Sequence, residues 1–157
     1  MMEEMRRQDR EISEAEAYEL LKNAEYGFLS TSDASGNPYG IPISFVLIEN
    51  KIYFHCACVG KKIVNLNQNS CVSFCVVGKT QPVYDKNFTT YFESVVLSGT
   101  AEKVTEKEEK YVILTALCEK YLPDYMNQAQ SSIEKSESAT CVYRIEIENI
   151  KGKAKRK

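Results

Sequence analysis

Three apolar, strand-like segments follow one another between residues 26 and 59 with only short turns between them. They are YGFLSTSD, YGIPISFVLI and IYFHCACV, and the turn sequences DASGNP and ENK separate them. Connections this short join antiparallel strands, because a parallel crossover needs a dozen or more residues. This part of the chain is therefore predicted to form successive antiparallel hairpins, with Pro42 at an edge or bulge position.

Helical patterns flank these strands. Ser13 and Glu16 form a capping-box pair that predicts a first helix ending before Gly27. A second pair, Thr105 and Glu108, predicts the start of a later helix. The remaining patterns predict helices over 61–69 and 106–122, strands over 71–78, 89–104 and 140–153, a loop over 79–88, and a polar, irregular segment with one short helix over 124–139.

Six strands with hairpin connections predict a mainly β fold, a six-stranded antiparallel barrel with flanking helices. A parallel, doubly wound sheet would need a helix after nearly every strand. The strand over 89–104 is expected to bend near Ser98 and Gly99, because glycine in a strand often marks a bulge. The chain shows no internal repeat and no linker, so we expect a single domain over 1–157, with its core at about 11–150.

Charge and hydropathy exclude several classes of protein. The 157 residues carry a formal net charge of -2, which lacks the basic surplus of a nucleic-acid-binding protein. The basic end KGKAKRK is interpreted as a solvated terminus. No apolar run approaches the ~20 residues of a membrane span, and the charged N-terminus has no signal-peptide core. The expected location is the cytoplasm.

The six cysteines form no CxxC pair. With a single histidine in the chain, few imidazole ligands are available, so no metal site is predicted and a zinc site is the minor alternative. We expect reduced cysteines that act as small apolar core residues.

The junction HCACVGKK runs from a strand into a helix. Gly60 allows a tight turn, and Lys61 and Lys62 follow in the first helical turn. Cations are unfavourable at a helix N-terminus, where the dipole is already positive, so this pattern indicates that an anion such as phosphate binds there. The alternative is two surface lysines that happen to begin a helix.

His55 is the only imidazole and precedes this junction on the strand. Alternation places it on the same face as Tyr53 and Ala57. Centring the ENK hairpin on Asn50 would bring Phe45 opposite His55. The imidazole could supply a proton to a ligand, or it could be a half-buried hydrogen-bonded residue that only shapes a pocket.

Four stretches of the sequence, taken in order, resemble a known family. They are MRRQDREI, GFLSTSDASGNPYGIPISFV, IYFHCACVGKKIVNLNQN and TTYFESVVLSGTAEKV. The chain is similar to flavin-binding split-barrel proteins related to pyridoxamine 5′-phosphate oxidase, and most similar to their nitroimidazole-resistance (Nim) branch. The likeness covers about residues 5 to 150. It implies a six-stranded split β-barrel that forms a homodimer and holds FMN, or sometimes FAD, between subunits.

The resemblance also implies which residues make the site. Lys61 or Lys62 would bind the flavin phosphate, and His55 would lie near the flavin or the substrate. The other residues implied or proposed to contact the cofactor are Ile43, Ser44, Phe45, Tyr53, Thr89, Thr90, Phe92, Glu93 and Ser94. The arginine-rich substrate pattern of true pyridoxamine-phosphate oxidases is not found, which argues against vitamin B6 oxidation.

Three functions remain open at this point. The first is an FMN-dependent oxidoreductase that reduces a small acceptor such as a nitroimidazole or another nitroaromatic. The second is a flavin-binding module without turnover that stores, senses or passes electrons. The third is a structural barrel dimer whose lysines are surface residues. The segment TTYFESVVLSG carries large apolar residues on both faces, which independently predicts a subunit interface.

Overall fold

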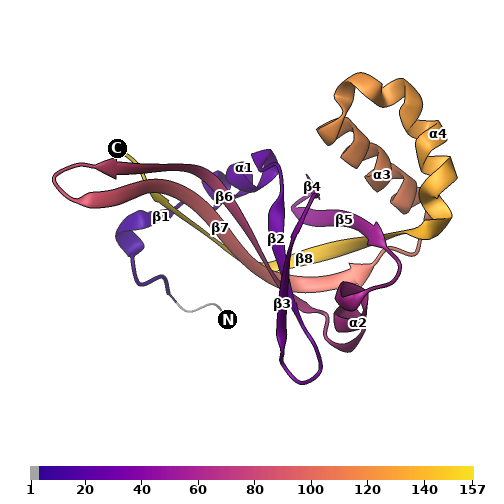
Figure 1. Cartoon of the computed structure of the whole chain (residues 1–157), viewed down its shortest axis with the longest axis horizontal. Helices are drawn as coiled ribbons and strands as arrows, with labels where there is room; N and C mark the ends of the chain where they lie inside the picture. The colour runs from indigo at the N-terminus through magenta and orange to yellow at the C-terminus, as the bar shows by residue number, and fades with distance from the viewer. Residues whose placement is uncertain (1–3) are drawn as a thin grey trace.

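The computed structural model describes residues 4–157, which form one antiparallel sheet of eight strands with helices around it (Figure 1). The strand order is β3-β2-β6-β7-β8-β5-β4, and β1 pairs with β8. The elements are β1 (Glu11–Ile12), α1 (Glu14–Asn23), β2 (Gly27–Ser32), β3 (Pro38–Ile43), β4 (Val46–Ile48), β5 (Lys51–Ala57), α2 (Lys61–Gln68), β6 (Cys71–Tyr84), β7 (Phe88–Lys103), α3 (Lys107–Tyr121), α4 (Met126–Ser136) and β8 (Thr140–Lys155).

The mainly β, antiparallel split-barrel fold is confirmed, although this part of the chain has eight strands rather than six. The second expected strand is broken at Ser44 and Phe45 into β3 and β4, and β1 adds a two-residue strand. None of the helices within residues 4–157 has the length and apolar character of a membrane span.

The two capping boxes have different outcomes. At α1, the Ser13 hydroxyl accepts a hydrogen bond from the Glu16 amide at 3.2 Å, and the Glu16 carboxylate accepts one from the Ser13 amide at 3.3 Å. The second box is wrong, because α3 begins one residue later, with Glu106 at its N-cap and no side-chain cap from any described residue.

The expected loop over 79–88 is instead part of a long β-hairpin. Strands β6 and β7 pair out to Tyr84 and Phe88, and only the turn residues 85–87 lie outside them. This arm projects well beyond the barrel (Figure 1). Most of its outer residues are exposed, so the arm lacks the buried face whose alternation reveals a strand in a sequence.

The basic end of the chain is not a solvated tail. β8 continues to Lys155 beside β7, and Gly152 and Ala154 are buried. A side chain at position 152 would collide with Ile12, since a Cβ atom there would lie 2.5 Å from its Cγ1 atom. The lysines therefore alternate with small residues on which β1 and α1 pack.

The β4–β5 hairpin turns at Glu49 and Asn50, whose φ angles of 49° and 61° are typical of a type I′ turn. Its register pairs Val46 with Tyr53 and Ile48 with Lys51. Extending this register places Ser44, and not Phe45, opposite His55. The predicted pairing of Phe45 with His55 is therefore wrong by one position, which exchanges the two faces of the strand.

The described core has two clusters of buried side chains, one on each side of the β5–β8 region. Phe45, Phe54 and Phe74 belong to the cluster that α1 covers. Tyr53 and Val142 belong to the second, beneath α3 and α4. The expectation of six reduced cysteines is also corrected, because Cys58 and Cys141 form a disulfide, and Cys56, Cys71, Cys75 and Cys118 are free.

The bend predicted near Ser98 and Gly99 is present as a register shift between β7 and β8. A Cβ atom at Gly99 would lie 2.0 Å from the backbone oxygen of Glu146. Replacing Gly99 with alanine is expected to lower the free energy of unfolding by at least about 2 kcal/mol, because the backbone must move to admit the methyl group. Urea denaturation measures this change.

The matched control is Gly40→Ala in β3. A Cβ atom there would meet only the Ser30 hydroxyl at 3.6 Å, so the free energy of unfolding should change by less than about 0.5 kcal/mol. Equal denaturation midpoints for the two variants would contradict the bulge assignment.

Candidate functional site

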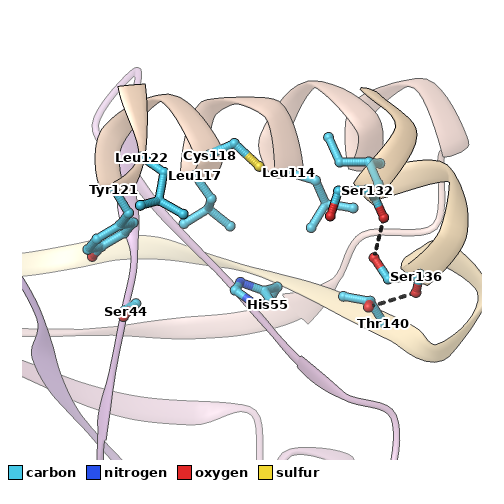
Figure 2. Close-up of a pocket in the computed structure, with 11 residues that line it drawn as sticks. Ser44, His55, Leu114, Leu117, Cys118, Tyr121, Leu122, Ser132, Ser136 and Thr140 are labelled. Atoms are coloured by element: carbon cyan, nitrogen blue, oxygen red, sulfur yellow. Dashed lines mark hydrogen bonds between the residues drawn. The ribbon is translucent and has the colours of Figure 1, made fainter. Parts of the chain in front are cut away.

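A cavity of about 560 Å³ lies between the α3–α4 pair and the β5–β8 edge (Figure 2). This volume is within the range of small-molecule sites. Most of its wall is apolar, and polar groups come from β5, from α4 and from the residues that flank these elements. The lining residues are Ser44, His55, Leu114, Leu117, Cys118, Tyr121, Leu122, Ser132, Ile133, Ser136 and Thr140.

Figure 2 shows His55 reaching from β5 toward α3, with Ser44 on one side and Thr140 on the other. Strand alternation explains its position, since Phe54 packs in the opposite core while Tyr53 and His55 face α3 and α4. The pKa of the imidazole is lowered from its usual value, first by desolvation and second by the positive charge of Lys62. His55 is therefore largely neutral at pH 7 in this environment.

The β5–α2 junction has the geometry of an anion site. Gly60 is the N-cap of α2 with φ of 122°, a backbone conformation that favours glycine. The first turn of α2 carries no acidic residue, and its N-cap makes no side-chain hydrogen bond within the described chain. The amides at this helix end are thus available to a ligand.

Lys61 and Lys62 extend to different sides of this junction. The Lys61 ammonium lies 4.9 Å from the centroid of the Tyr39 ring on β3. Lys62 acts electrostatically on His55 and Cys56 of β5. Neither lysine has a carboxylate within 4.0 Å among residues 4–157, so both charges remain available.

The cavity and the junction are neighbours along the chain, although no residue between Cys56 and Lys62 lines the cavity. His55 precedes Gly60 by five residues, and β5 ends between them at Ala57, so the two are separated by at most about 16 Å at ~3.3 Å per extended residue. Between them, Ala57 pairs with Thr140, which lines the cavity. The positive charge of Lys62 reaches His55, so the two places are close enough for the α2 start to influence the cavity.

The last turn of α3 fixes the break between β3 and β4, a role that the sequence did not reveal. The Tyr121 hydroxyl accepts a hydrogen bond from the Phe45 amide at 3.0 Å and donates to the Glu25 carbonyl at 2.5 Å. The Lys120 ammonium donates to the carbonyls of Phe45 at 2.8 Å and Ala24 at 2.9 Å. These contacts hold the backbone that presents Ser44 to the cavity.

Burial lowers the pKa of Lys120 to about 8, from 10.5 for an unperturbed lysine. Between these values the unfolded chain binds more protons than the folded one, so this group makes the free energy of unfolding rise with pH. Replacing Lys120 with methionine should flatten the profile between about pH 8 and 10.5. Lys22→Met, at an exposed position of α1, is the control and should keep the wild-type slope. Parallel denaturation profiles for wild type and K120M would contradict the assignment.

The structure brings some of the predicted site residues together and separates others. Ser44 and His55 share the cavity, and Ile43 and Ser44 line a second, shallower pocket of about 510 Å³. The side chain of Phe45 is 0% exposed and that of Tyr53 is buried, so neither side chain is presented to a ligand in this chain.

The predicted cofactor residues of β7 lie on the projecting arm, away from the cavity. They are Thr89, Thr90, Phe92, Glu93 and Ser94. Glu93 forms an ion pair with Arg156 at 3.0 Å, and Thr89 accepts a hydrogen bond from Lys155. Because β8 separates β7 from β5, these residues do not join His55 within one chain (Figure 1).

Comparison with known proteins agrees with this architecture. A candidate 5-nitroimidazole antibiotic resistance protein from Bacteroides thetaiotaomicron superposes with a TM-score of 0.76 at 22% identity, over 92% of this chain and 86% of that one. A conserved hypothetical protein from Mycobacterium tuberculosis gives 0.82 at 22% identity, over 96% and 90%. The FAD and heme binding protein from Mycobacterium smegmatis gives 0.81 at 19% identity, over 92% and 72%.

These identities establish a shared fold and no more. A search of curated proteins finds no match to this chain. The sequence profile of the pyridoxamine 5′-phosphate oxidase family, however, matches residues 13–154. Since this match covers most of the chain, the resemblance seen in the sequence is confirmed, and the chain belongs to the pyridoxamine 5′-phosphate oxidase family.

Proposed function

We propose that this protein binds FMN and reduces a small acceptor at the bound flavin. The observation that carries the proposal is the lysine-bearing start of α2, whose Lys62 acts electrostatically on His55 in the neighbouring cavity. The phosphate would bind the α2 amides with Lys61 or Lys62, and the ring system would lie toward Ser44 and His55. FAD, which several relatives are named for binding, is the other flavin to test.

The residues present fit such a cofactor. Two lysines without carboxylate partners among the described residues match a phosphate, and a largely apolar cavity matches a planar ring. The bound flavin would supply hydride transfer. The chain itself would orient the ring, exclude water beneath α3 and α4, and offer the His55 imidazole for a hydrogen bond or a proton to the acceptor.

We further propose that the working unit is a homodimer in the cytoplasm. The pairing register places four apolar residues on one face of β2, β6 and β7. They are Phe28, Cys75, Val77 and Val96. Phe28, Val77 and Val96 are exposed there, and Tyr84 and Phe88 are exposed at the tip of the arm. Burying this apolar surface in a second copy would also carry Thr89, Thr90, Phe92, Glu93 and Ser94 toward the partner.

Light scattering at micromolar concentration should therefore give a dimer mass. Val96→Glu is expected to shift the mass toward the monomer, because the substitution replaces an apolar side chain of the interface with a carboxylate that must lose its water. Val112→Glu is the control. It makes the same change at an exposed valine on α3, outside the proposed interface, and should leave the dimer intact. A wild-type monomer that still holds flavin would contradict the interface.

A non-catalytic flavin-binding module is the second candidate, supported by the breadth of the relatives, which include a flavocytochrome of Azotobacter vinelandii. The discriminating experiment supplies the FMN-loaded protein with NADPH and a nitroimidazole without oxygen, and follows the nitro absorbance. Turnover beyond one acceptor per flavin supports the reductase. Flavin that stays bound without any turnover, with NADH as well as NADPH, supports the storage or electron-transfer role.

A further inference from the structure

Three cysteines meet at the end of β5, next to the start of α2. Cys58 and Cys141 are bonded across 83 residues, with Cα atoms 5.1 Å apart. Cys56 is the direct cross-strand partner of Cys141 and is half-buried. The free cysteines Cys71, Cys75 and Cys118 lie on β6 and α3, outside this group.

The disulfide fastens the part of the chain that leads into the proposed phosphate site. Pairing between β5 and β8 ends at Ala57 and Thr140, so Cys58 lies one residue beyond the last pair. Gly60, the N-cap of α2, follows two residues later. The bond to Cys141 therefore holds this turn against β8, beside the cavity residue Thr140, whose hydroxyl donates to Ser136 at 2.8 Å.

The two bonded sulfur atoms differ in access. Cys58 is an exposed residue, whereas Cys141 is only 3% exposed. Burial raises the pKa of the Cys56 thiol, which keeps it protonated and makes it a poor attacking group. An incoming thiolate from solvent thus meets Cys58 first.

We propose that Cys58 and Cys141 form a reversible redox site that controls the order of the β5–α2 turn and, through it, anion binding at α2. The functional half of this inference rests on the proposed FMN site. The reductant is a dithiol. Disulfides that are exposed to a cytoplasmic thiol pool typically form and break reversibly.

The reaction balances as a two-electron exchange. One thiolate of the dithiol attacks Cys58, the bond to Cys141 breaks, and Cys141 leaves as a thiolate that takes a proton. The second thiol of the reductant then displaces Cys58, which is released and protonated. The reductant becomes a disulfide, and residues 58–60 lose their covalent tie to β8.

The test uses the full-length protein purified without reductant. Alkylation and mass spectrometry should find four reactive thiols under denaturing conditions and a Cys58–Cys141 peptide bridge, then six thiols after dithiothreitol. Hydrogen exchange of the amides at 59–64 should become at least ~10-fold faster after reduction, because a local constraint has been removed. FMN, the probe for the anion site, should bind at least ~3-fold more weakly to the reduced protein, while riboflavin should bind equally to both forms.

Matched variants separate the possible results. Cys58→Ser should exchange rapidly at 59–64 without reductant, whereas Cys71→Ser, at an exposed free cysteine, should behave as wild type. Cys56→Ser should keep the bridge. Six reactive thiols before reduction, a Cys56–Cys141 bridge in the wild type, or identical exchange in both redox forms would overturn the redox site. Redox-dependent exchange with no FMN binding in either form would retain the redox site but overturn its control of FMN binding and the proposed FMN function.

Discussion

FMN affinity is expected to fall by ~10²-fold or more when Lys61 and Lys62 are both replaced by alanine. A charged hydrogen bond to phosphate contributes roughly 1.5–3 kcal/mol, and each 1.4 kcal/mol is about tenfold in affinity. Both charges are lost from an α2 terminus that carries no acidic residue in its first turn. Fluorescence titration of FMN measures the change.

Riboflavin, which has no phosphate, serves as the ligand control and should bind wild type and variant almost equally. Lys107→Ala is the matched protein control. Lys107 also stands at the first position of a helix without a side-chain cap among the described residues, but Glu108 and Glu109 follow it. Undiminished FMN binding by the double variant would contradict the phosphate assignment.

Replacing His55 with glutamine is expected to leave FMN bound and to lower acceptor reduction by at least ~10-fold. General acid catalysis typically contributes about 10²–10⁴-fold, and glutamine keeps a hydrogen-bonding group but cannot titrate. Because the pKa of His55 is lowered by desolvation and by Lys62, the acid form is scarce at pH 7. The wild-type rate should therefore rise as the pH falls from 8 to 5, and the variant should lose this dependence.

Ser132→Ala is a suitable companion variant, since Ser132 lines the same cavity from α4 and carries no titratable group. It should change the rate much less than H55Q and keep the pH profile. If H55Q turns over as fast as wild type across pH 5–8, His55 is a packing residue of the cavity wall.

Local signals in the sequence predicted the elements whose neighbours lie close along the chain. The Ser13–Glu16 box and the Gly60 turn each depend on a few adjacent residues, and each is present. The bulge at Gly99 was indicated by the glycine alone, although its partner in β8 lies far along the chain. The ENK turn was recognised, but its centre falls between Glu49 and Asn50. That shift turns the side chain of Phe45 into the core and gives Ser44 its place beside His55.

The missed features depend on partners far away in sequence. The strand over 140–153 was predicted, but its basic end was interpreted as a solvated terminus, because β1 and β7, which pack on Gly152 and Ala154, lie far away in sequence. The Cys58–Cys141 bond spans 83 residues, and no spacing rule indicates it. The sequence shows Lys120 and Tyr121 only as polar residues at the end of a helix. Their hydrogen bonds could not be predicted, because the carbonyl partners lie 75 residues or more upstream. The arm residues of β7 need a second chain before their predicted contact with flavin can be made.

The central claim is that this chain holds a flavin at the β5–α2 junction. The most direct measurement is the absorbance spectrum of the purified protein after FMN is added and unbound ligand removed, with the released cofactor identified by mass. The predicted result is flavin bands near one FMN per chain in the wild type, and their loss from the Lys61→Ala, Lys62→Ala double variant. A folded wild-type protein that stays colourless and retains neither FMN nor FAD would contradict the claim.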